Sequence, residues 1–284
     1  MKHAIFTVSM PNSTPREAAT KIKAAGGHGV EWRVVRDAGD TAKPGFWSGN
    51  KCTLQVDWTE AQFKDVAAIT RDAGLEVPNL GTYTAAENLD EVEKMMGVAK
   101  LFGAPSLRVG GLGYDGNTPY PKMLENAQAR FAKVLELGRK HGVKTLVEIH
   151  HGTIVPSASA AWRLVSAFSP KEIGVILDPG NMMYEGYENW QMGLEILGPY
   201  LGHVHVKSAM PVPKPLKSPQ RLGFDVTWAS PRAGAVDFAK VFRALKTVGY
   251  DGWLSVEDFA TGLDDEWVIR DAFAFLREMD AFTA

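Results

Sequence analysis

Four side chains that can bind a metal ion recur along the chain, and each lies at the end of a short apolar run. They are Glu148 in LVEIHHG, Asp178 in VILDPGN, His205 in HVHVKS and Glu257 in WLSVEDF. The runs are rich in Val, Ile and Leu, which is typical of strands buried on both faces. The carboxyl ends of parallel strands meet at one edge of a sheet, so these side chains would converge there. Three carboxylates and one imidazole suit Mg²⁺, Mn²⁺ or Co²⁺ better than a structural zinc ion.

Eight such apolar runs alternate with segments of helical periodicity. The predicted strands are His3–Ser9, Gly29–Val35, Leu75–Leu80, Ala104–Val109, Val143–Ile149, Ile173–Asp178, Gly202–Lys207 and Trp253–Glu257. The predicted helices are Thr14–Ala25, Thr59–Ala73, Ala85–Phe102, Lys122–His141, Ala158–Phe168, Asn189–Leu197, Asp237–Val248 and Glu266–Met279. Ser13 or Thr14 before Pro15, and Thr59 before Glu60, are helix start signals. Eight alternating units predict an α/β protein with a single (β/α)8 TIM-barrel domain over residues 1–284.

An open, doubly wound sheet is the alternative architecture. The candidate ligands lie on the fifth to eighth predicted strands, which a barrel brings together and a flat sheet would hold apart. No G-x-G-x-x-G fingerprint follows the first strand. The barrel is therefore the preferred prediction.

Two connections are longer than the others. Arg36–Asp57 contains Phe46 and Trp47, and Ser208–Val236 contains five prolines. Both follow predicted strands, so both belong to the side where a barrel carries its chemistry. Long loops there are often lids or binding loops, but a surface excursion or an oligomer contact is an equal alternative.

The overall composition excludes several kinds of protein. The net charge of −2 gives no basic surface for nucleic acid or anionic membranes. The single cysteine, Cys52, excludes an intramolecular disulfide and a cysteine-based zinc cluster. The N-terminal apolar run is too short for a signal peptide, and no run approaches the roughly 18 apolar residues of a membrane span. We expect a cytoplasmic protein without membrane or nucleic-acid partners, and leave a homo-oligomer open.

Strand periodicity helps to choose among neighbouring candidates. Residues two apart share one face of a strand, so His203 pairs with His205, and Glu148 with His150. The residue nearer the carboxyl end reaches the barrel mouth, which favours His205 over His203. Glu148 and His150 are both compatible with the mouth on geometry alone.

Together these motifs resemble one known superfamily. EIH (148–150), LDPGN (177–181), HVHVK (203–207) and GYDGWLSVE (249–257) look like the xylose-isomerase-like TIM barrels, in particular their sugar phosphate isomerase/epimerase group. That group includes ketose 3-epimerases, hydroxypyruvate isomerases and inosose dehydratases. The resemblance implies one divalent metal ion held by Glu148, Asp178, His205 and Glu257.

The chain departs from the family pattern at two places near the predicted site. Ser208 follows Lys207 where many members have aspartate, and Asn181 stands where ketose 3-epimerases usually place a substrate-binding histidine. These departures weaken assignment to a ketose epimerase and leave the four ligands intact.

The resemblance also implies a reaction. A divalent ion with four protein ligands keeps positions open for two oxygens of a hydroxy-ketone, and stabilises the enediolate formed when a proton leaves the carbon beside the carbonyl. In the resembling enzymes the matching glutamates also shuttle protons, so Glu148 and Glu257 are expected to be catalytic. The predicted activity is isomerisation or epimerisation of a keto sugar or a related hydroxy-ketone. A lyase or dehydratase that expels a β-oxygen from the same intermediate is the alternative.

Six further side chains are candidates for contacting a carbohydrate or hydroxy-ketone substrate. They are His150, Asn181, Lys207, Arg108, Trp32 and Arg232. Structural alternatives stand beside four of them: His150 as a packed, hydrogen-bonded residue, Lys207 in a rim salt bridge, Trp32 in the core, and Arg108 paired with a carboxylate such as Glu31.

Overall fold

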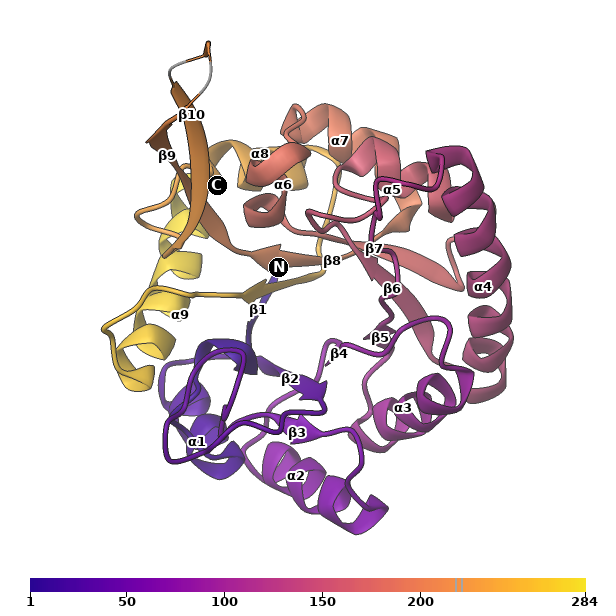
Figure 1. The fold of residues 1–284 in the computed structure, drawn as a ribbon. Coiled ribbons are helices and arrows are strands. Elements are labelled where there is room, and N and C mark those ends of the chain that lie inside the picture. The colour runs from indigo at the N-terminus through magenta and orange to yellow at the C-terminus, as the bar shows by residue number, and fades with distance from the viewer. Residues whose placement is uncertain (218, 221) are drawn as a thin grey trace.

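The computed structural model describes residues 1–217, 219–220 and 222–284, and these form a closed barrel of parallel strands ringed by helices (Figure 1). The barrel strands are β1 (Lys2–Phe6), β2 (Gly29–Val35), β4 (Leu80–Thr82), β5 (Ser106–Arg108), β6 (Lys144–Glu148), β7 (Ile173–Leu177), β8 (Leu201–Val206) and β11 (Trp253–Val256). Pairing of β1 with both β2 and β11 closes the ring. The predicted (β/α)8 barrel is confirmed.

Helices connect the strands on the outside of the barrel. They are α1 (Pro15–Ala24), α2 (Glu60–Asp72), α3 (Leu89–Phe102), α4 (Tyr120–His141), α5 (Ala158–Val165), α6 (Pro179–Glu185), α7 (Trp190–Leu197), α8 (Phe238–Thr247) and α9 (Asp265–Phe282). Thr14 and Thr59 cap α1 and α2, and each forms a capping box with the residue three positions later. The start signals in the sequence therefore predict where α1 and α2 begin.

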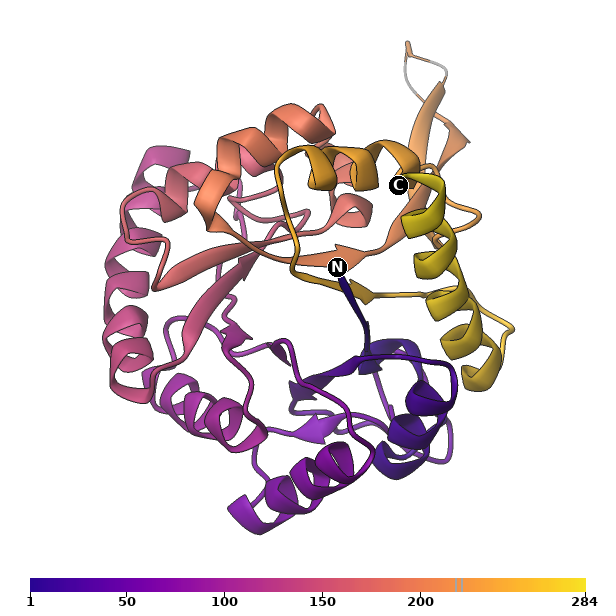
Figure 2. The same cartoon turned by 180° about the vertical axis from the view of Figure 1, so that it is seen from behind.

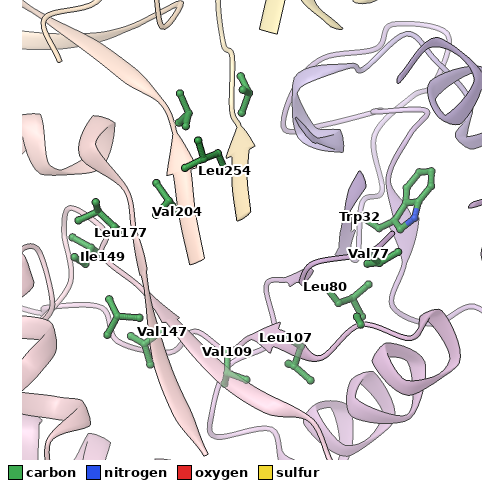
Figure 3. Close-up of a cluster of buried hydrophobic side chains, with 14 of the residues drawn as sticks. Trp32, Val77, Leu80, Leu107, Val109, Val147, Ile149, Leu177, Val204 and Leu254 are labelled. Carbon is green, nitrogen blue, oxygen red and sulfur yellow. The ribbon is translucent and has the colours of Figure 1, made fainter. Parts of the chain in front are cut away.

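The apolar core lies between the strands and the helices. Alternate strand residues such as Val147, Val204 and Leu254 point outward and pack there, as Figure 3 shows. Their neighbours Glu148 and His205 are also buried, on the opposite, inward face of the same strands. The barrel interior is therefore unusually polar toward the carboxyl ends of the strands.

The third barrel strand lies later in the chain than predicted. The sequence predicts a strand at Leu75–Leu80, whereas β4 begins at Leu80. Pro78 lies between the two segments and has no N–H to donate to a ladder. Glu76 keeps only an isolated bridge to Gly29, and the paired strand forms after the proline.

Both long connections contain strands that were not predicted. A short strand, β3 (Leu54–Gln55), pairs with β2, and β9 (Ser208–Pro215) and β10 (Leu222–Ala229) form an antiparallel hairpin. Figure 2 shows this hairpin extending away from the barrel. Pro211, Pro213 and Pro215 alternate along β9, so their missing N–H groups all fall on one edge and the other edge still pairs with β10.

Among the described residues, no helix is long and apolar enough to cross a membrane.

Candidate active site

The four predicted metal ligands come together at the carboxyl ends of four neighbouring strands. One ligand atom from each of Glu148, Asp178, His205 and Glu257 lies within 4.8 Å of the others, and all four side chains are buried. Strand order β11–β8–β7–β6 puts Glu257 and Glu148 at the two ends of the run. A cation in this position would have oxygen ligands from both ends and one nitrogen ligand from the middle.

His205 lies at the centre of this group. Its Nδ1 is 2.9 Å from Glu148 Oε1, 3.2 Å from Glu257 Oε1 and 3.7 Å from Asp178 Oδ2. Burial would lower the pKa of His205, but the carboxylates of Glu31 and Glu257 outweigh it and hold the pKa well above its usual value. Without a cation, the imidazolium form of His205 therefore balances part of the negative charge.

Arg108 on β5 is the charged partner of Glu148. Its guanidinium contacts Glu148 Oε2, while its Nε donates to the carbonyl of Thr82 at 2.9 Å and its plane lies over the Tyr83 ring. Burial would raise the pKa of Glu148, but Arg108 and His205 hold it well below its usual range. Glu148 is consequently a carboxylate. The alternative that Arg108 pairs with a nearby carboxylate is confirmed, and its partner is Glu148 instead of Glu31.

Lys207 lies beneath the mouth and pairs with two of the candidate ligands. Its Nζ is 3.0 Å from Glu257 Oε2 and 3.4 Å from Asp178 Oδ2. The ring of Trp228 from the β9–β10 hairpin covers this ammonium at 4.3 Å. The sequence-based alternative for Lys207 was a salt bridge at the rim of the barrel. Lys207 does form salt bridges, but they are buried.

Burial raises the pKa of Glu257, with Lys207 and His205 opposing the shift and the other carboxylates adding to it. The two glutamates therefore have opposite shifts. Glu148 is held anionic, whereas Glu257 keeps its proton to a higher pH. Such a pair can supply an acid and a base in one site.

The helix α6 begins directly after Asp178 and orients its carboxylate. Asp178 Oδ1 accepts from the backbone N–H of Asn181 at 2.8 Å, and Oδ2 accepts from the Asn181 side-chain amide at 2.8 Å. Asn181 is fully buried, and its Oδ1 accepts from Lys207. Asn181 therefore orients Asp178 and Lys207, and its contact with a substrate stays a prediction.

The charges of the buried groups fit a divalent cation. Glu31 joins the three ligand carboxylates inside the barrel, and among the described residues Arg108 and Lys207 are the cations paired with this group. With neutral histidines, four carboxylates and two cations leave an excess of two negative charges. Such an excess is costly in a buried site unless a bound cation neutralises it.

A cleft of about 260 Å³ opens beside Glu148 at the ends of β4, β5 and β6. Its lining includes Tyr83, Arg108, His150 and Thr153. His150 Nδ1 lies 2.7 Å from the carbonyl oxygen of His151, which can only accept a hydrogen bond. His150 therefore carries a proton on Nδ1.

Two of the predicted substrate contacts do not reach this site. Trp32 is fully buried and donates from Nε1 to Thr70 of α2 at 3.1 Å, so it lies in the layer between strands and helices (Figure 3). Arg232 pairs with Asp271 and Glu278 of α9 on the outside of the barrel. Trp32 alternates with Glu31 and Arg33 along β2, and this alternation in the sequence indicates its outward direction.

Aromatic side chains from both long connections cover the site, and the sequence did not predict this cover. Trp228 contacts His151, Tyr184 and Phe259 with ring centroids 5.1–5.7 Å away. Trp47, from the connection after β2, packs on Phe259 at 4.8 Å. A tryptophan in each long connection could have indicated an aromatic cover. That the two side chains meet over the site depends on the path of each connection, which the sequence does not show.

The sequence and the fold both have recognisable relatives. A family model described as Xylose isomerase-like TIM barrel matches residues 20–279. Inosose dehydratase from Geobacillus thermodenitrificans (strain NG80-2) is 26% identical over 130 residues, which is 43% of this chain and 42% of that protein. The chain therefore matches less than half the length of this curated relative.

Two solved structures illustrate the shared fold. A D-tagatose 3-epimerase-like protein has a TM-score of 0.74 at 16% identity, over 100% of this chain and 98% of that one. The IOLI protein with a binding zinc atom has a TM-score of 0.70 at 15% identity, again over 100% and 98%. Because the family model covers most of the sequence and the barrel agrees with it, the chain belongs to the Xylose isomerase-like TIM barrel family.

Proposed function

We propose that this protein is a divalent-metal-dependent isomerase or epimerase of a keto sugar or a related hydroxy-ketone. The observation that carries the proposal is the convergence of Glu148, Asp178, His205 and Glu257 beside an open cleft. The excess of two negative charges that the barrel carries once His205 is neutral adds support. Mn²⁺, Mg²⁺ and Co²⁺ are the candidate ions, because carboxylate-rich sites suit them.

The two glutamates have complementary roles in this proposal. A bound divalent cation would stabilise negative charge on the substrate oxygens. Glu148, which Arg108 keeps anionic, takes the proton from the carbon beside the carbonyl. Glu257, whose pKa is raised by burial, returns a proton from the other end of the strand run. Each glutamate then faces a different side of the substrate, and each proton transfer is worth on the order of 100- to 10,000-fold in rate.

A dehydratase or lyase is the second candidate function. His150 lines the cleft, and within the described part of the chain its Nε2 makes no hydrogen bond. A third acid–base group beside Glu148 could assist the departure of a β-hydroxyl. The similarity to inosose dehydratase also favours this chemistry.

Metal-dependent exchange of substrate hydrogen with solvent tests the proposal. Metal-free protein is loaded with Mn²⁺ and incubated in D₂O with keto sugars, inositol ketones and 3-keto-glycosides, and products are read by NMR and mass spectrometry. We expect deuterium at a carbon beside a carbonyl. The signal should be lost in Glu148→Gln, which removes the proposed base, and in Glu257→Gln, which removes a proposed metal ligand. No metal binding by the wild-type protein would refute the proposed chemistry.

Asp258→Asn is the matched control. Asp258 follows Glu257, is equally buried, and uses Oδ1 to accept from the N–H of Ala260 at 2.8 Å. Exchange should survive this change. Product mass separates the two functions: unchanged mass indicates an isomerase, whereas loss of water or of an aglycone indicates a lyase. In the second case His150→Gln should reduce elimination more than exchange.

A further inference from the structure

A buried carboxylate on β2 contacts both histidines of β8. Glu31 Oε2 lies 3.0 Å from His203 Nε2 and 3.3 Å from His205 Nε2, and Glu31 is completely buried. Glu31 is therefore next to the candidate metal ligands but shielded from the cleft. Because it is buried away from the cleft, Glu31 cannot contact a substrate directly. It can affect the site only through its neighbours His203 and His205.

On the side away from the two histidines, a chain of hydrogen bonds holds Glu31 in place. The side-chain amide of Asn79 donates to Glu31 Oε1 at 2.7 Å, and Ser106 Oγ donates to Asn79 Oδ1 at 2.9 Å. The Ser106 bond orients the Asn79 amide so that its NH₂ group faces Glu31. Both Glu31 oxygens are therefore acceptors, surrounded by groups that must donate.

This arrangement determines which nitrogen of His205 keeps its proton when a cation binds. Both ring nitrogens face carboxylates: Nε2 faces Glu31, whereas Nδ1 faces Glu148, Glu257 and Asp178. Only the carboxylates on the Nδ1 side belong to the candidate ligand set, so a cation bound there displaces the proton of Nδ1. Nε2 keeps its proton and donates it to Glu31, which can only accept.

We propose that Glu31 is a positioning residue that holds His205 as its Nε2–H tautomer and aims Nδ1 at the metal. The inference rests on the proposed metal site. A second metal ion held by Glu31, His203 and His205 is the competing explanation, because their ligand atoms also lie within 4.8 Å of one another. The Asn79 amide argues against it, since its NH₂ group already donates to Glu31 Oε1.

The first test compares metal binding by the wild-type protein, Glu31→Gln and Asp265→Asn. Glutamine keeps the shape of Glu31 but presents an NH₂ group to one of the surrounding donors. Asp265 is a buried carboxylate that accepts from Asn12 and Ser13, and it is a matched control for loss of a buried acid. We expect Glu31→Gln to bind Co²⁺ about 10- to 100-fold more weakly, with an altered visible spectrum, and Asp265→Asn to change neither.

The second test needs no folded variant at position 31. Wild-type protein with ¹⁵N-labelled histidine is loaded with Zn²⁺, and the tautomer of His205 is read from its nitrogen shifts, assigned by their absence in His205→Gln. We expect a proton on Nε2 and the metal on Nδ1. The opposite tautomer would overturn the inference.

Failure of the inference and failure of the proposed function are distinguishable. If the wild-type protein binds no metal, the proposed function fails and the inference falls with it. If it binds one Co²⁺ and Glu31→Gln matches its affinity and spectrum, only the inference fails. Two equivalents of Co²⁺ in the wild-type protein and one in Glu31→Gln would make Glu31 a ligand and overturn the positioning role.

Discussion

At the scale of single residues, partners decide how each buried acid behaves. Glu148 and Glu257 are both buried glutamates at strand ends, and by residue type they are equivalent. Glu148 contacts the permanent cation Arg108, whereas Glu257 shares Lys207 with Asp178. Their pKa values consequently shift in opposite directions.

Replacing Arg108 by Gln should make metal binding sensitive to acid. Without the guanidinium, burial raises the pKa of Glu148, so protons compete with the metal as the pH falls. Mn²⁺ affinity should drop more at acidic than at alkaline pH. The unfolding free energy should fall by about 3–5 kcal/mol, because a buried carboxylate loses its partner. Titrations at both pH values and urea denaturation measure the two effects, and Arg108→Lys, which keeps the charge, is the control. An equal loss of affinity at both pH values would contradict this account.

Metal uptake should release at least one proton. The pKa of His205 is held well above its usual value, so the imidazole is protonated at neutral pH in the metal-free site. A metal on Nδ1 must displace that proton, and affinity should therefore rise with pH until the pH exceeds this pKa. Calorimetry in buffers of different ionisation enthalpy counts the protons. Binding that is independent of both pH and buffer would show that His205 is not a ligand.

At the scale of elements, the β9–β10 hairpin forms part of the site. Most of the hairpin extends away from the barrel, and Phe224 is 65% exposed. Near its base, Trp228 covers Lys207, and Tyr184 of α6 donates to the carbonyl of Val226 at 3.3 Å. The base therefore favours the predicted binding-loop role for this connection, whereas the outer part leaves the oligomer alternative open.

Trp228→Leu should weaken catalysis more than Phe224→Leu, although both change an aromatic residue of β10. Loss of the Trp228 ring exposes Lys207 to water and removes a contact worth up to about 2 kcal/mol. We expect kcat/KM to fall by about tenfold, which corresponds to about 1.4 kcal/mol. Phe224→Leu should leave kcat/KM close to the wild-type value. Steady-state kinetics on the substrate found by exchange tests this, and equal effects of both changes would contradict it.

At the scale of the whole molecule, the barrel brings charges from distant parts of the chain into one interior. Glu31 and Glu257 are separated by most of the sequence, yet both lie near His205. Repulsion within this interior opposes folding unless cations balance it. Metal binding and fold stability should therefore be linked.

Removing the metal should lower the melting temperature. At a metal concentration 100-fold above Kd, binding stabilises the folded state by about 2.7 kcal/mol. For a domain of this size, that corresponds to roughly 5–10 °C. Differential scanning fluorimetry with EDTA and with Mn²⁺ measures the shift, which should be smaller in Asp178→Asn. A melting temperature that is the same in EDTA and Mn²⁺ would argue against a bound cation at this site.

The sequence by itself determined the barrel and the four converging ligands. Both follow from local patterns, because apolar runs alternate with helical segments along the chain, and residues at strand ends must meet when parallel strands close into a ring. Even the outward direction of Trp32 was present in the alternation of β2. The metal-binding and catalytic roles of Glu148, Asp178, His205 and Glu257 stay predictions that the experiments above test.

The tertiary structure alone decided which groups touch across the barrel. Arg108 pairs with Glu148, which is 40 positions away, and Glu31 contacts His205, which is 174 positions away. Trp228, which covers Lys207, lies 21 positions further along, in the long connection after β8. Such contacts depend on register, strand tilt and loop course, none of which has a local sequence signal. They set the charge and proton positions in the site, and these decide its chemistry.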